Sequence, residues 1–316
     1  MRALIIDQVS QNIRAFLEER GAQVDHVFLP SHDELKEIIE SYDLLVMRVD
    51  PFIDQEILDA AKNLKAITVA AVGTNHIDLE YAEKKGIRVT NAPGMNSNTV
   101  AELTVSKMLD LARNTIPANN TVKEQHCWNK YVWTGIELKG KVLGIIGLGK
   151  IGTRVVELLR GFDMKVIAYD PFLEDKEFAR RGANKVTLEE LLEKSDVISL
   201  HLPLNNETRG MISYAEFDRM KEGAILLNMA RGGIMDEDAA YSNLKSGKMR
   251  GIGVDVMSCE LGGGAMKGES HVESPLFEFE NFIVSPHIAG GGTIDGLDLL
   301  GDCVIDHICE IFGYRR

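Results

Sequence analysis

The sequence lacks the features that mark secreted, membrane and metal-binding proteins. Its 316 residues include only four cysteines, and none of them forms a C-x-x-C pair or lies at a zinc-ligand spacing from histidine. Met1 to Ile6 leads directly into an expected strand, with no signal-peptide core or cleavage site. No run approaches the roughly 18 uninterrupted apolar residues of a spanning helix. We therefore expect no metal site, reduced thiols, no membrane partner and a cytoplasmic location.

Positive charge is also scarce in this chain. Lys and Arg number 35 against 48 Asp and Glu, which gives a net charge of −13. Without a basic stripe to neutralise phosphates, nucleic acid is excluded as a partner, although a local arginine can still bind a small anionic substrate. Apolar residues make up 45% and charged residues 26%, the balance of an ordinary globular protein whose length suggests two domains.

A glycine-rich turn between two apolar runs is the most informative motif. The runs Val142 to Ile146 and Val166 to Tyr169 are short enough to be buried strands, and the segment between them has a helical apolar period. Gly147, Gly149 and Gly152 follow the first run in the spacing G-x-G-x-x-G. In this context the glycines permit a tight turn, the approach of a pyrophosphate and close packing of helix on strand. Because free amides at the helix start face the phosphates, we predict a dinucleotide site and not merely a turn.

An acidic residue ends the second strand of this motif. Asp170 lies 170 − 152 = 18 residues after Gly152, where a carboxylate can accept hydrogen bonds from the adenosine ribose. Pro171 and Phe172 follow it, and no arginine is present there to hold a ribose phosphate. NAD is therefore favoured over NADP.

Short apolar runs and helical periods alternate along the whole chain, which predicts parallel sheets in an α/β fold. We expect helices at 12–19, 54–62, 99–112 and 293–312, with others starting at Ser31 and Asp78. The helix at 99–112 links the two domains, and 293–312 returns to the first. The expected strands are 3–6, 24–28, 44–47, 66–71, 87–90, 142–146, 166–169, 185–187, 197–200, 224–227, 252–255 and 282–285.

Three polar residues of the second half follow strand-like runs. Arg231 follows the run 224–227, Glu260 lies five places past Asp255, and His287 follows the run 282–285. The carboxyl ends of parallel strands share one edge of a sheet, so all three should meet where the glycine turn lies. A lone histidine or glutamate is more often structural, but a guanidinium beside two glycines is well suited to binding a carboxylate in two places.

Two further candidates follow strands of the first half in the same way. Arg48 comes after the run 44–47, and the loop Val72 to Asn75 comes after the run 66–71. Taken alone, they could equally be a surface arginine and a connecting turn.

The chain resembles the D-isomer-specific 2-hydroxyacid dehydrogenases, most closely those that act on 3-phosphoglycerate and lack a regulatory domain. The resemblance covers about 42–312 and implies two doubly wound parallel-sheet domains. A Rossmann NAD domain of 98–287 would be inserted into a flavodoxin-like substrate domain of 1–97 and 288–316, and the family normally forms homodimers through its NAD domains. The matching stretches are NAPGMNSNTVAEL, ELKGKVLGIIGLGKIG, HLPLNNETRGMI, LLNMARGGIMDEDAA, GVDV and SPHIAGG.

The resemblance also implies the site residues, each matched to a position of this chain. The catalytic residues would be Arg231, Glu260 and His287. The NAD contacts would be Gly147, Gly149, Lys150, Ile151, Gly152, Asp170, His201, Pro203, Thr208, Met229, Ala230, Asp255 and Gly290. The substrate contacts would be Arg48, Val72, Gly73, Thr74 and Asn96, together with Arg231 and His287.

These residue types suit hydride transfer between a nicotinamide and a 2-keto carbon. Negative charge develops on the keto oxygen and must be neutralised by a proton, for which His287 would be the acid and, in reverse, the base. Glu260 would hold the imidazole in orientation and favour its protonated form. Arg231 would bind the substrate carboxylate and polarise the keto oxygen.

Three departures from the family pattern leave the substrate open. Val69 stands where animal-type phosphoglycerate enzymes carry an arginine, and His76 replaces a common asparagine. Glu260 is followed by Leu261 and a glycine-rich insertion, Gly262 to Ser270, where relatives usually have a proline. The role of this insertion is open.

The expected activity is the NAD-dependent interconversion of a small D-2-hydroxy acid and its 2-keto acid, with 3-phosphoglycerate as the first candidate. Hydroxypyruvate, glyoxylate and other short 2-keto acids are alternatives within the class. An NAD(H)-sensing binding protein of the corepressor type is the alternative from another class, because such proteins keep the same three residues. The absence of added basic or disordered tails favours the enzyme.

Overall fold

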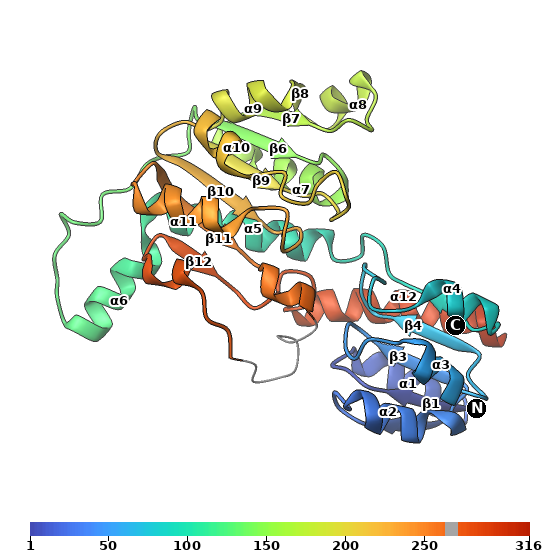
Figure 1. Cartoon of the computed structure of the whole chain (residues 1–316). Helices are drawn as coiled ribbons and strands as arrows, with labels where there is room; N and C mark the ends of the chain where they lie inside the picture. The colour runs from blue at the N-terminus through green and yellow to red at the C-terminus, as the bar shows by residue number, and fades with distance from the viewer. Residues whose placement is uncertain (263–270) are drawn as a thin grey trace. The chain divides into compact units, whose positions relative to one another are not determined.

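The chain forms two compact units in a computed structural model that describes residues 1–262 and 271–316. One unit contains residues 1–99 and 290–316, and the other contains the described residues between 100 and 289. Each unit is an α/β structure built on one parallel sheet (Figure 1).

The first unit has a five-stranded sheet in the order β2-β1-β3-β4-β5, which is the flavodoxin-like order. All its strand pairs are parallel. The strands are β1 (Arg2–Ile5), β2 (Gln23–His26), β3 (Leu44–Met47), β4 (Ala66–Val69) and β5 (Arg88–Thr90). The helices are α1 (Gln11–Glu19), α2 (His32–Ile38), α3 (Gln55–Ala60), α4 (Leu79–Lys84) and α12 (Ile294–Phe312), with a short 3-10 helix η1 (Ile39–Ser41).

Helices cover both faces of this sheet. Residues of α1 and α12 share one apolar core with Leu44 and Val46, whereas residues of α2, α3 and α4 share the other with Leu45 and Met47. Alternate residues of β3 thus enter opposite cores, and all four are fully buried. A strand buried on both faces reads as an unbroken apolar run, which explains why these strands were recognisable in the sequence.

Side-chain caps start the helices of this unit where the sequence places them. Ser31 and Glu34 form the expected capping box of α2. Asp54, Asp78 and Thr293 accept backbone hydrogen bonds at the starts of α3, α4 and α12. The last helix packs on α1 in the first unit, so the predicted return of the terminal segment is confirmed.

The second unit has a seven-stranded sheet in the order β12-β11-β10-β9-β6-β7-β8. Its strands are β6 (Val142–Ile146), β7 (Lys165–Tyr169), β8 (Asn184–Lys185), β9 (Val197–Leu200), β10 (Ala224–Asn228), β11 (Met249–Val254) and β12 (Phe282–Val284). All pairs are parallel, and the strand order reverses between β6 and β9. This is the Rossmann order with one added strand, and the reversal marks the point where such sheets bind ligands.

Helices cover both faces of the second sheet as well. α5 (Ser97–Arg113, of which 100–113 belong to this unit), α7 (Lys150–Leu158) and α8 (Asp175–Arg180) supply one core, and α9 (Leu188–Lys194), α10 (Tyr214–Arg219) and α11 (Glu237–Lys245) supply the other. Short 3-10 helices are η2 (Leu159–Phe162), η3 (Ser258–Gly262) and η4 (Pro275–Glu278). No helix within the described ranges is long and apolar enough to cross a membrane.

Each of the twelve expected strands overlaps an observed one, so the predicted fold class is confirmed. Helix boundaries were less accurate. The linking helix begins at Ser97, not Thr99. α6 (Thr115–Gln125) was not predicted, and it extends with the following loop away from the sheet of its unit (Figure 1).

Candidate active site

The glycine turn between β6 and α7 has the geometry of a phosphate cradle. Gly147 has φ +90°, and a Cβ there would lie closer than 3.0 Å to the carbonyl oxygen of His201. Gly149, in contrast, faces open space, with no atom of the described residues within 4 Å of an added Cβ. α7 begins directly after Gly149, and among the described residues no side chain forms a cap hydrogen bond to it. The positive end of this helix therefore faces the turn, where it favours an anion.

Asp170 fixes this turn from the end of β7. Its two carboxylate oxygens accept the backbone amides of Leu148 and Phe172, each at 3.0 Å. Arg181 donates to the Leu148 carbonyl oxygen at 2.6 Å. A carboxylate oxygen has more than one lone pair, so Asp170 keeps the capacity to accept hydrogen bonds from a ribose. An open glycine, uncapped amides and this carboxylate together fit a dinucleotide.

The loop after β9 lies on the other side of the strand-order reversal. The His201 ring contacts the Ser199 hydroxyl through Nε2 at 2.8 Å, while its buried Nδ1 has no partner among the described residues. Burial lowers the pKa of His201 to about 3, so the ring is neutral at physiological pH. Thr208 donates to the Pro203 carbonyl oxygen at 2.6 Å, which gives the loop a fixed shape. His201, Pro203 and Thr208 thus form one ordered segment beside the glycine turn.

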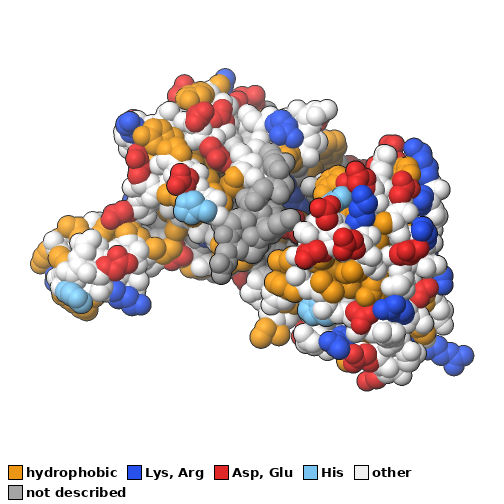
Figure 2. Space-filling view, turned by 60° about the horizontal axis from the view of Figure 1, so that its bottom comes forward, with side chains coloured by type: hydrophobic (Ala, Val, Ile, Leu, Met, Phe, Trp, Pro, Cys, Tyr) orange, Lys and Arg blue, Asp and Glu red, His pale blue; other side chains and the backbone are white. Residues whose placement is uncertain are grey.

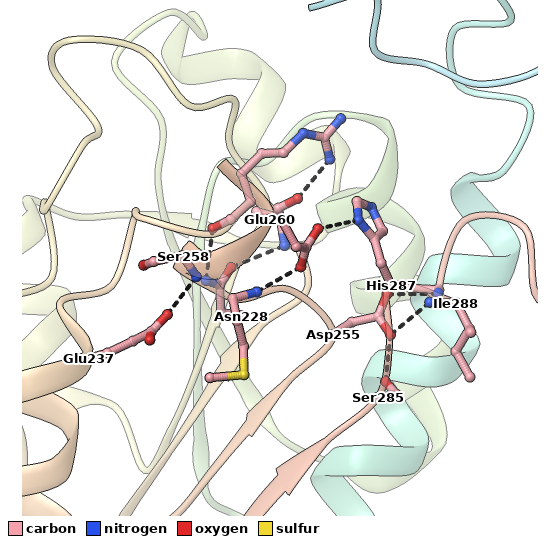
Figure 3. Close-up of polar contacts among 12 residues, drawn as sticks. Asn228, Glu237, Asp255, Ser258, Glu260, Ser285, His287 and Ile288 are labelled. Atoms are coloured by element: carbon pink, nitrogen blue, oxygen red, sulfur yellow. Dashed lines mark hydrogen bonds and ion pairs between the residues drawn. The ribbon is translucent and has the colours of Figure 1, made fainter. Parts of the chain in front are cut away.

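Glu260 and His287 form the closest charged contact of this unit's candidate site. Glu260 Oε2 lies 2.6 Å from His287 Nδ1, and Glu260 Oε1 accepts the Met257 amide at 2.7 Å (Figure 3). Because an ionised carboxylate can only accept, the proton of this contact resides on Nδ1. His287 Nε2 is then the ring nitrogen left to exchange a proton with another molecule.

The histidine is held in an uncommon backbone conformation. His287 has φ 51°, in the left-handed region, and its amide donates to the carbonyl oxygens of Asp255 and Ser285. The Asp255 carboxylate accepts the Ser285 hydroxyl, the Ile288 amide at 3.1 Å and the Ala289 amide at 2.7 Å. Asp255 is 1% exposed, and this burial raises its pKa, while the hydrogen bonds and the nearby His287 oppose the rise. The buried Asp255 thus holds the loop of His287 in its uncommon conformation through several hydrogen bonds at once.

Arg231 is positioned by the end of β10. The buried Asn228 side chain accepts the Ala230 amide at 3.1 Å and donates to the Arg231 carbonyl oxygen at 3.0 Å. The guanidinium donates to the Ala230 carbonyl oxygen at 2.7 Å. Burial lowers the pKa of Arg231 below its usual range, and the charge of Glu260 acts in the opposite direction. The interaction of Arg231 with the charge of Glu260 and the contact of Glu260 with His287 indicate that the three residues occupy neighbouring loops at one edge of the sheet.

A small apolar cluster lies beside these loops. The buried Val100, Met229 and Ala289 pack together, with Leu103 and Ile151 against them. They come from α5, the loop after β10, the loop after His287 and the start of α7. Two of the predicted coenzyme contacts, Met229 and Ile151, therefore share one apolar surface, with Ala230 and Lys150 adjacent in the chain.

The first unit contains the remaining candidates, which lie at the carboxyl edge of its own sheet. Asp7 follows β1, and its carboxylate accepts the amides of Arg48 at 3.2 Å and Val49 at 3.3 Å. The Arg48 guanidinium lies so close to Gly291 that a Cβ there would overlap Nη2. Burial raises the pKa of Asp7, an effect that the charge of Arg48 opposes. Arg48 is thus fixed on both sides.

Two atoms in this region have no partner among the described residues. They are the buried Nε of Arg48 and the buried Oδ1 of Asn96, one a donor and the other an acceptor. Asn96 Nδ2 would lie 2.5 Å from a Cβ at Gly290. The loop that starts at Val72 is tied to β5 by Asn91, which donates to the Val72 carbonyl oxygen at 2.6 Å.

The departures from the family pattern have different settings in the structure. Val69 ends β4 and is fully buried in the core with α2, α3 and α4. His76 is 8% exposed, its Nε2 is unpartnered within the described chain, and burial lowers its pKa to about 4. Residues 263–270 of the expected insertion lie outside the described residues.

Three residues that order the site were not predicted. Asn228, Glu237 and Ser285 hold the loops of Arg231, Glu260 and Asp255 respectively (Figure 3). Asn228 and Ser285 end or follow apolar strands, and that position was the one available signal for them.

Comparison with known proteins relates this geometry to one family. Residues 105–289 match the model described as D-isomer specific 2-hydroxyacid dehydrogenase, NAD binding domain. A D-3-phosphoglycerate dehydrogenase of Archaeoglobus fulgidus is 37% identical over 92% of this chain and 53% of its own length. A hydroxypyruvate reductase of Thermotoga maritima is 38% identical over 98% of this chain and 96% of its own length.

A solved structure agrees with these sequence relatives. The D-lactate dehydrogenase of Aquifex aeolicus, complexed with NAD and lactic acid, has a TM-score of 0.83 and 30% identity over 99% of this chain and 96% of its own. The chain spans about half the length of the A. fulgidus phosphoglycerate dehydrogenase and nearly all of the T. maritima reductase. The family model, the parallel Rossmann sheet and the long shared alignments agree, and the chain belongs to the D-isomer specific 2-hydroxyacid dehydrogenase family.

Proposed function

We propose that this protein is an NAD-dependent oxidoreductase that interconverts a small D-2-hydroxy acid and its 2-keto acid. Residues 98–287 would form the NAD domain, and 1–97 with 288–316 the substrate domain. The observation that carries the proposal is the 2.6 Å contact between Glu260 and His287 at the sheet edge that also holds Arg231 and the glycine turn.

His287 is the acid–base group of this proposal. Bound NADH would supply a hydride to the keto carbon, and the developing charge on the keto oxygen needs a proton. His287 Nε2 is the ring nitrogen that Glu260 leaves free for this transfer, because Glu260 engages Nδ1. In the oxidative direction the same nitrogen accepts the hydroxyl proton, so one residue serves both directions.

Arg231 is the proposed anchor for the substrate carboxylate. A guanidinium can bind a carboxylate through two parallel hydrogen bonds, and partial burial strengthens the attraction. The backbone of Arg231 is fixed by Asn228, so its side chain starts from a defined point. An arginine bound to the carboxylate also lies close to the adjacent keto oxygen and stabilises its charge.

The coenzyme contacts follow from the cradle described above. Lys150, Ile151 and Gly152 supply the first-turn amides of α7, and Asp170 is the proposed partner of the adenosine ribose. Met229, Ala230 and Asp255 are proposed on the nicotinamide side, and Gly290 remains a proposed contact. The absence of an arginine directly after Asp170 supports NAD over NADP.

The first proposed substrate pair is 3-phosphoglycerate and phosphohydroxypyruvate, and hydroxypyruvate, glyoxylate or another short 2-keto acid is the alternative. Two relatives named for phosphoglycerate, one named for hydroxypyruvate and one named for glyoxylate are 36–38% identical to this chain, so identity does not separate these substrates. The proposed substrate contacts are Arg48, Val72, Gly73, Thr74 and Asn96. They are supported by two buried polar atoms, Arg48 Nε and Asn96 Oδ1, that have no hydrogen-bond partner among the described residues. The buried aliphatic Val69 offers no charge to a phosphate, so the phosphate contact that an arginine makes at this position in animal-type enzymes is absent from the proposed site.

A substrate screen tests this function directly. Purified protein and NADH are mixed with phosphohydroxypyruvate, hydroxypyruvate, glyoxylate and pyruvate, and NADH loss is followed by absorbance. We expect rapid loss with one of these acids and a loss slower by about 10²-fold or more with the protein carrying His287→Ala. Tight NADH binding without turnover of any acid would contradict the enzyme and favour a coenzyme-sensing protein.

We also propose a homodimer, supported by the apolar surface of the arm 114–136. Its base is fixed by Ile136, which donates to the Ala112 carbonyl oxygen at 2.8 Å. Trp128, Tyr131 and Val132 are 87%, 80% and 57% exposed, and hydrophobic side chains are visible on this projecting part in Figure 2. Exposed aromatic groups concentrated on one segment are typical of an interface, and a second copy of the chain is the proposed partner.

Sedimentation velocity at micromolar concentration tests the dimer. The wild type should sediment as a dimer and the double variant Trp128→Ser, Tyr131→Ser as a monomer, while Phe172→Ser, an exposed aromatic outside the arm, should remain dimeric. A monomeric wild type would contradict the proposal. We place the protein in the cytoplasm, which the four free cysteine thiols support.

A further inference from the structure

Glu237 is a half-buried carboxylate at the start of α11 that binds the backbone of a different loop. It is the first residue of α11, after the N-cap Asp236, where an acidic side chain commonly faces solvent. Here its Oε1 accepts the backbone amide of Ser258 at 2.6 Å, across 21 residues of sequence (Figure 3). The Glu237 carboxylate therefore points toward the loop of Ser258 and not into solvent.

Ser258 belongs to the turn that carries Glu260. The Met257 amide binds Glu260 Oε1 at 2.7 Å, and the next amide, Ser258, binds Glu237. The Glu260 amide also donates to the Met257 carbonyl oxygen at 3.2 Å, which closes the turn. Two consecutive amides are thus each held by a carboxylate, and one of these carboxylates is the partner of His287.

A second contact joins the same two segments. A Cβ at Gly232 would lie closer than 3.0 Å to the carbonyl oxygen and carbon of Met257, so glycine is needed for the two backbones to touch. Gly232 directly follows Arg231. Asp236 caps α11 and accepts the Ser213 hydroxyl at 3.0 Å, which anchors the helix start that bears Glu237. The segment 231–237 therefore contacts the start of the turn 257–260 twice, through Gly232 at Met257 and through Glu237 at Ser258.

From these contacts we propose that Glu237 is a positioning residue that fixes the Glu260 turn, so that Glu260 reaches His287 Nδ1. This inference rests on the proposed function, in which Glu260 and His287 form the acid–base pair. It adds that the contact between Glu260 and His287 depends on a third residue outside both of their loops. Glu260 is in place because a hydrogen bond from outside its own loop restrains the adjacent backbone.

The neighbouring thiol of Cys259 reports on this restraint. Cys259 is exposed, and its pKa is raised by partial burial and then by the charges of Glu260 and Glu237. The thiolate is the form that reacts with an alkylating agent. Loss of the Glu237 charge, or movement of the turn away from either carboxylate, therefore makes Cys259 react faster in the protein without coenzyme or substrate.

Two substitutions separate the hydrogen bond of Glu237 from its charge. Glu237→Gln removes the charge but keeps an oxygen that can accept the Ser258 amide, whereas Glu237→Ala removes both. Asp238→Ala is the matched control, because Asp238 is an exposed acidic residue in the same helical turn. All variants are first compared with the wild type by thermal unfolding.

The readouts are turnover, NADH affinity and the iodoacetamide rate of Cys259, which is located by peptide mass spectrometry. We expect Glu237→Ala to lower kcat at least about 10-fold with little change in NADH affinity, and Glu237→Gln to retain kcat within about 3-fold. Alkylation of Cys259 should rise about 3-fold in Glu237→Gln and about 10-fold or more in Glu237→Ala. Asp238→Ala should match the wild type in all three.

Two results would overturn this role of Glu237. One is equal kcat and equal Cys259 rates in the alanine and glutamine variants, which would assign Glu237 only an electrostatic effect. The other is a similar loss in Asp238→Ala, which would show a general effect of the helix terminus. If the wild type turned over no 2-keto acid, the proposed function would fail, and the ratio of the two Cys259 rates would still decide whether Glu237 restrains the turn.

Discussion

Gly147 and His201 meet where the strand order of the second sheet reverses. The backbone of Gly147 passes so close to the His201 carbonyl oxygen that any Cβ would overlap it, and φ +90° excludes most other residues there. The loops after β6 and β9 are therefore packed backbone to backbone. Two residues further on, Gly149 has an ordinary φ of −75° and open space beside it.

These two glycines should respond differently to the same substitution. Gly147→Ala should lower the free energy of unfolding by about 2–4 kcal/mol, because strain and overlap add. Gly149→Ala should change it by less than about 1 kcal/mol but weaken NADH binding at least about 10-fold, because the added methyl would occupy the space left for a pyrophosphate. Denaturant unfolding and fluorescence titration measure the two quantities. Unchanged NADH affinity in Gly149→Ala would contradict the cradle.

The acid–base assignment predicts the effect of removing the imidazole. His287→Ala should lower turnover by about 10²-fold or more, with NADH affinity changed by less than about 3-fold. His271→Ala is the matched control, because His271 also contacts a glutamate, Glu273 at 3.2 Å, but both side chains are exposed. The control should keep turnover within about 2-fold. Near-normal turnover in His287→Ala would remove the histidine from the mechanism.

The parallel sheets were predictable because their central strands, such as β3, β4, β9 and β10, are buried on both faces. Runs such as LLVM at 44–47 and AILL at 224–227 contain no polar residue and end at turn signals, so their type and place followed from composition alone. α6 was missed for the opposite reason. Its sequence, TIPANNTVKEQ, contains few apolar residues and no clear helical stripe, because this helix extends away from the sheet instead of packing on it.

The candidate site was predictable in part. Arg231 and His287 follow strands, and the parallel order brings such positions to one edge of a sheet. Glu260 was proposed with them from its position five places past Asp255, and the resemblance then assigned its role. The hydrogen bond that fixes its turn comes from Glu237, whose sequence context is that of an ordinary first-turn acid. The positive φ of His287 also has no local sequence signal, because it results from hydrogen bonds to Asp255 and Ser285.

The buried His76 predicts a pH dependence of stability in the first unit. Its pKa is about 4 in the folded protein and near 6.5 when unfolded. Between these values the unfolded chain binds a proton that the folded protein excludes, so the free energy of unfolding falls as the pH falls below 6.5. From pH 7 to pH 5 the loss due to His76 is about 2 kcal/mol.

Urea unfolding at pH 7 and pH 5 gives the change in the free energy of unfolding between the two pH values. The comparison of this change between the variant and the wild type measures the loss due to His76. His76→Asn should be less sensitive to acid than the wild type by that amount, whatever the substitution costs at pH 7. The exposed His26 provides the control, since His26→Asn should leave the pH dependence unchanged. Equal acid sensitivity in His76→Asn and the wild type would contradict a lowered pKa of His76 in the folded protein.

Asp170 predicts the coenzyme preference, but its structural role must be separated from its role in binding. Its carboxylate orders the glycine turn through the amides of Leu148 and Phe172, so Asp170→Ala should weaken any dinucleotide to some extent. NAD should lose more, by about 10-fold or more, because the free 2′-hydroxyl of its ribose loses an acceptor, whereas the 2′-phosphate of NADP has no such hydrogen bond to lose. Titrations of NADH and NADPH against the wild type, Asp170→Ala and the exposed control Asp175→Ala give the ratio. Equal losses for the two coenzymes would mean that Asp170 only shapes the turn, because a contact to the ribose must distinguish the coenzymes at the one position where they differ.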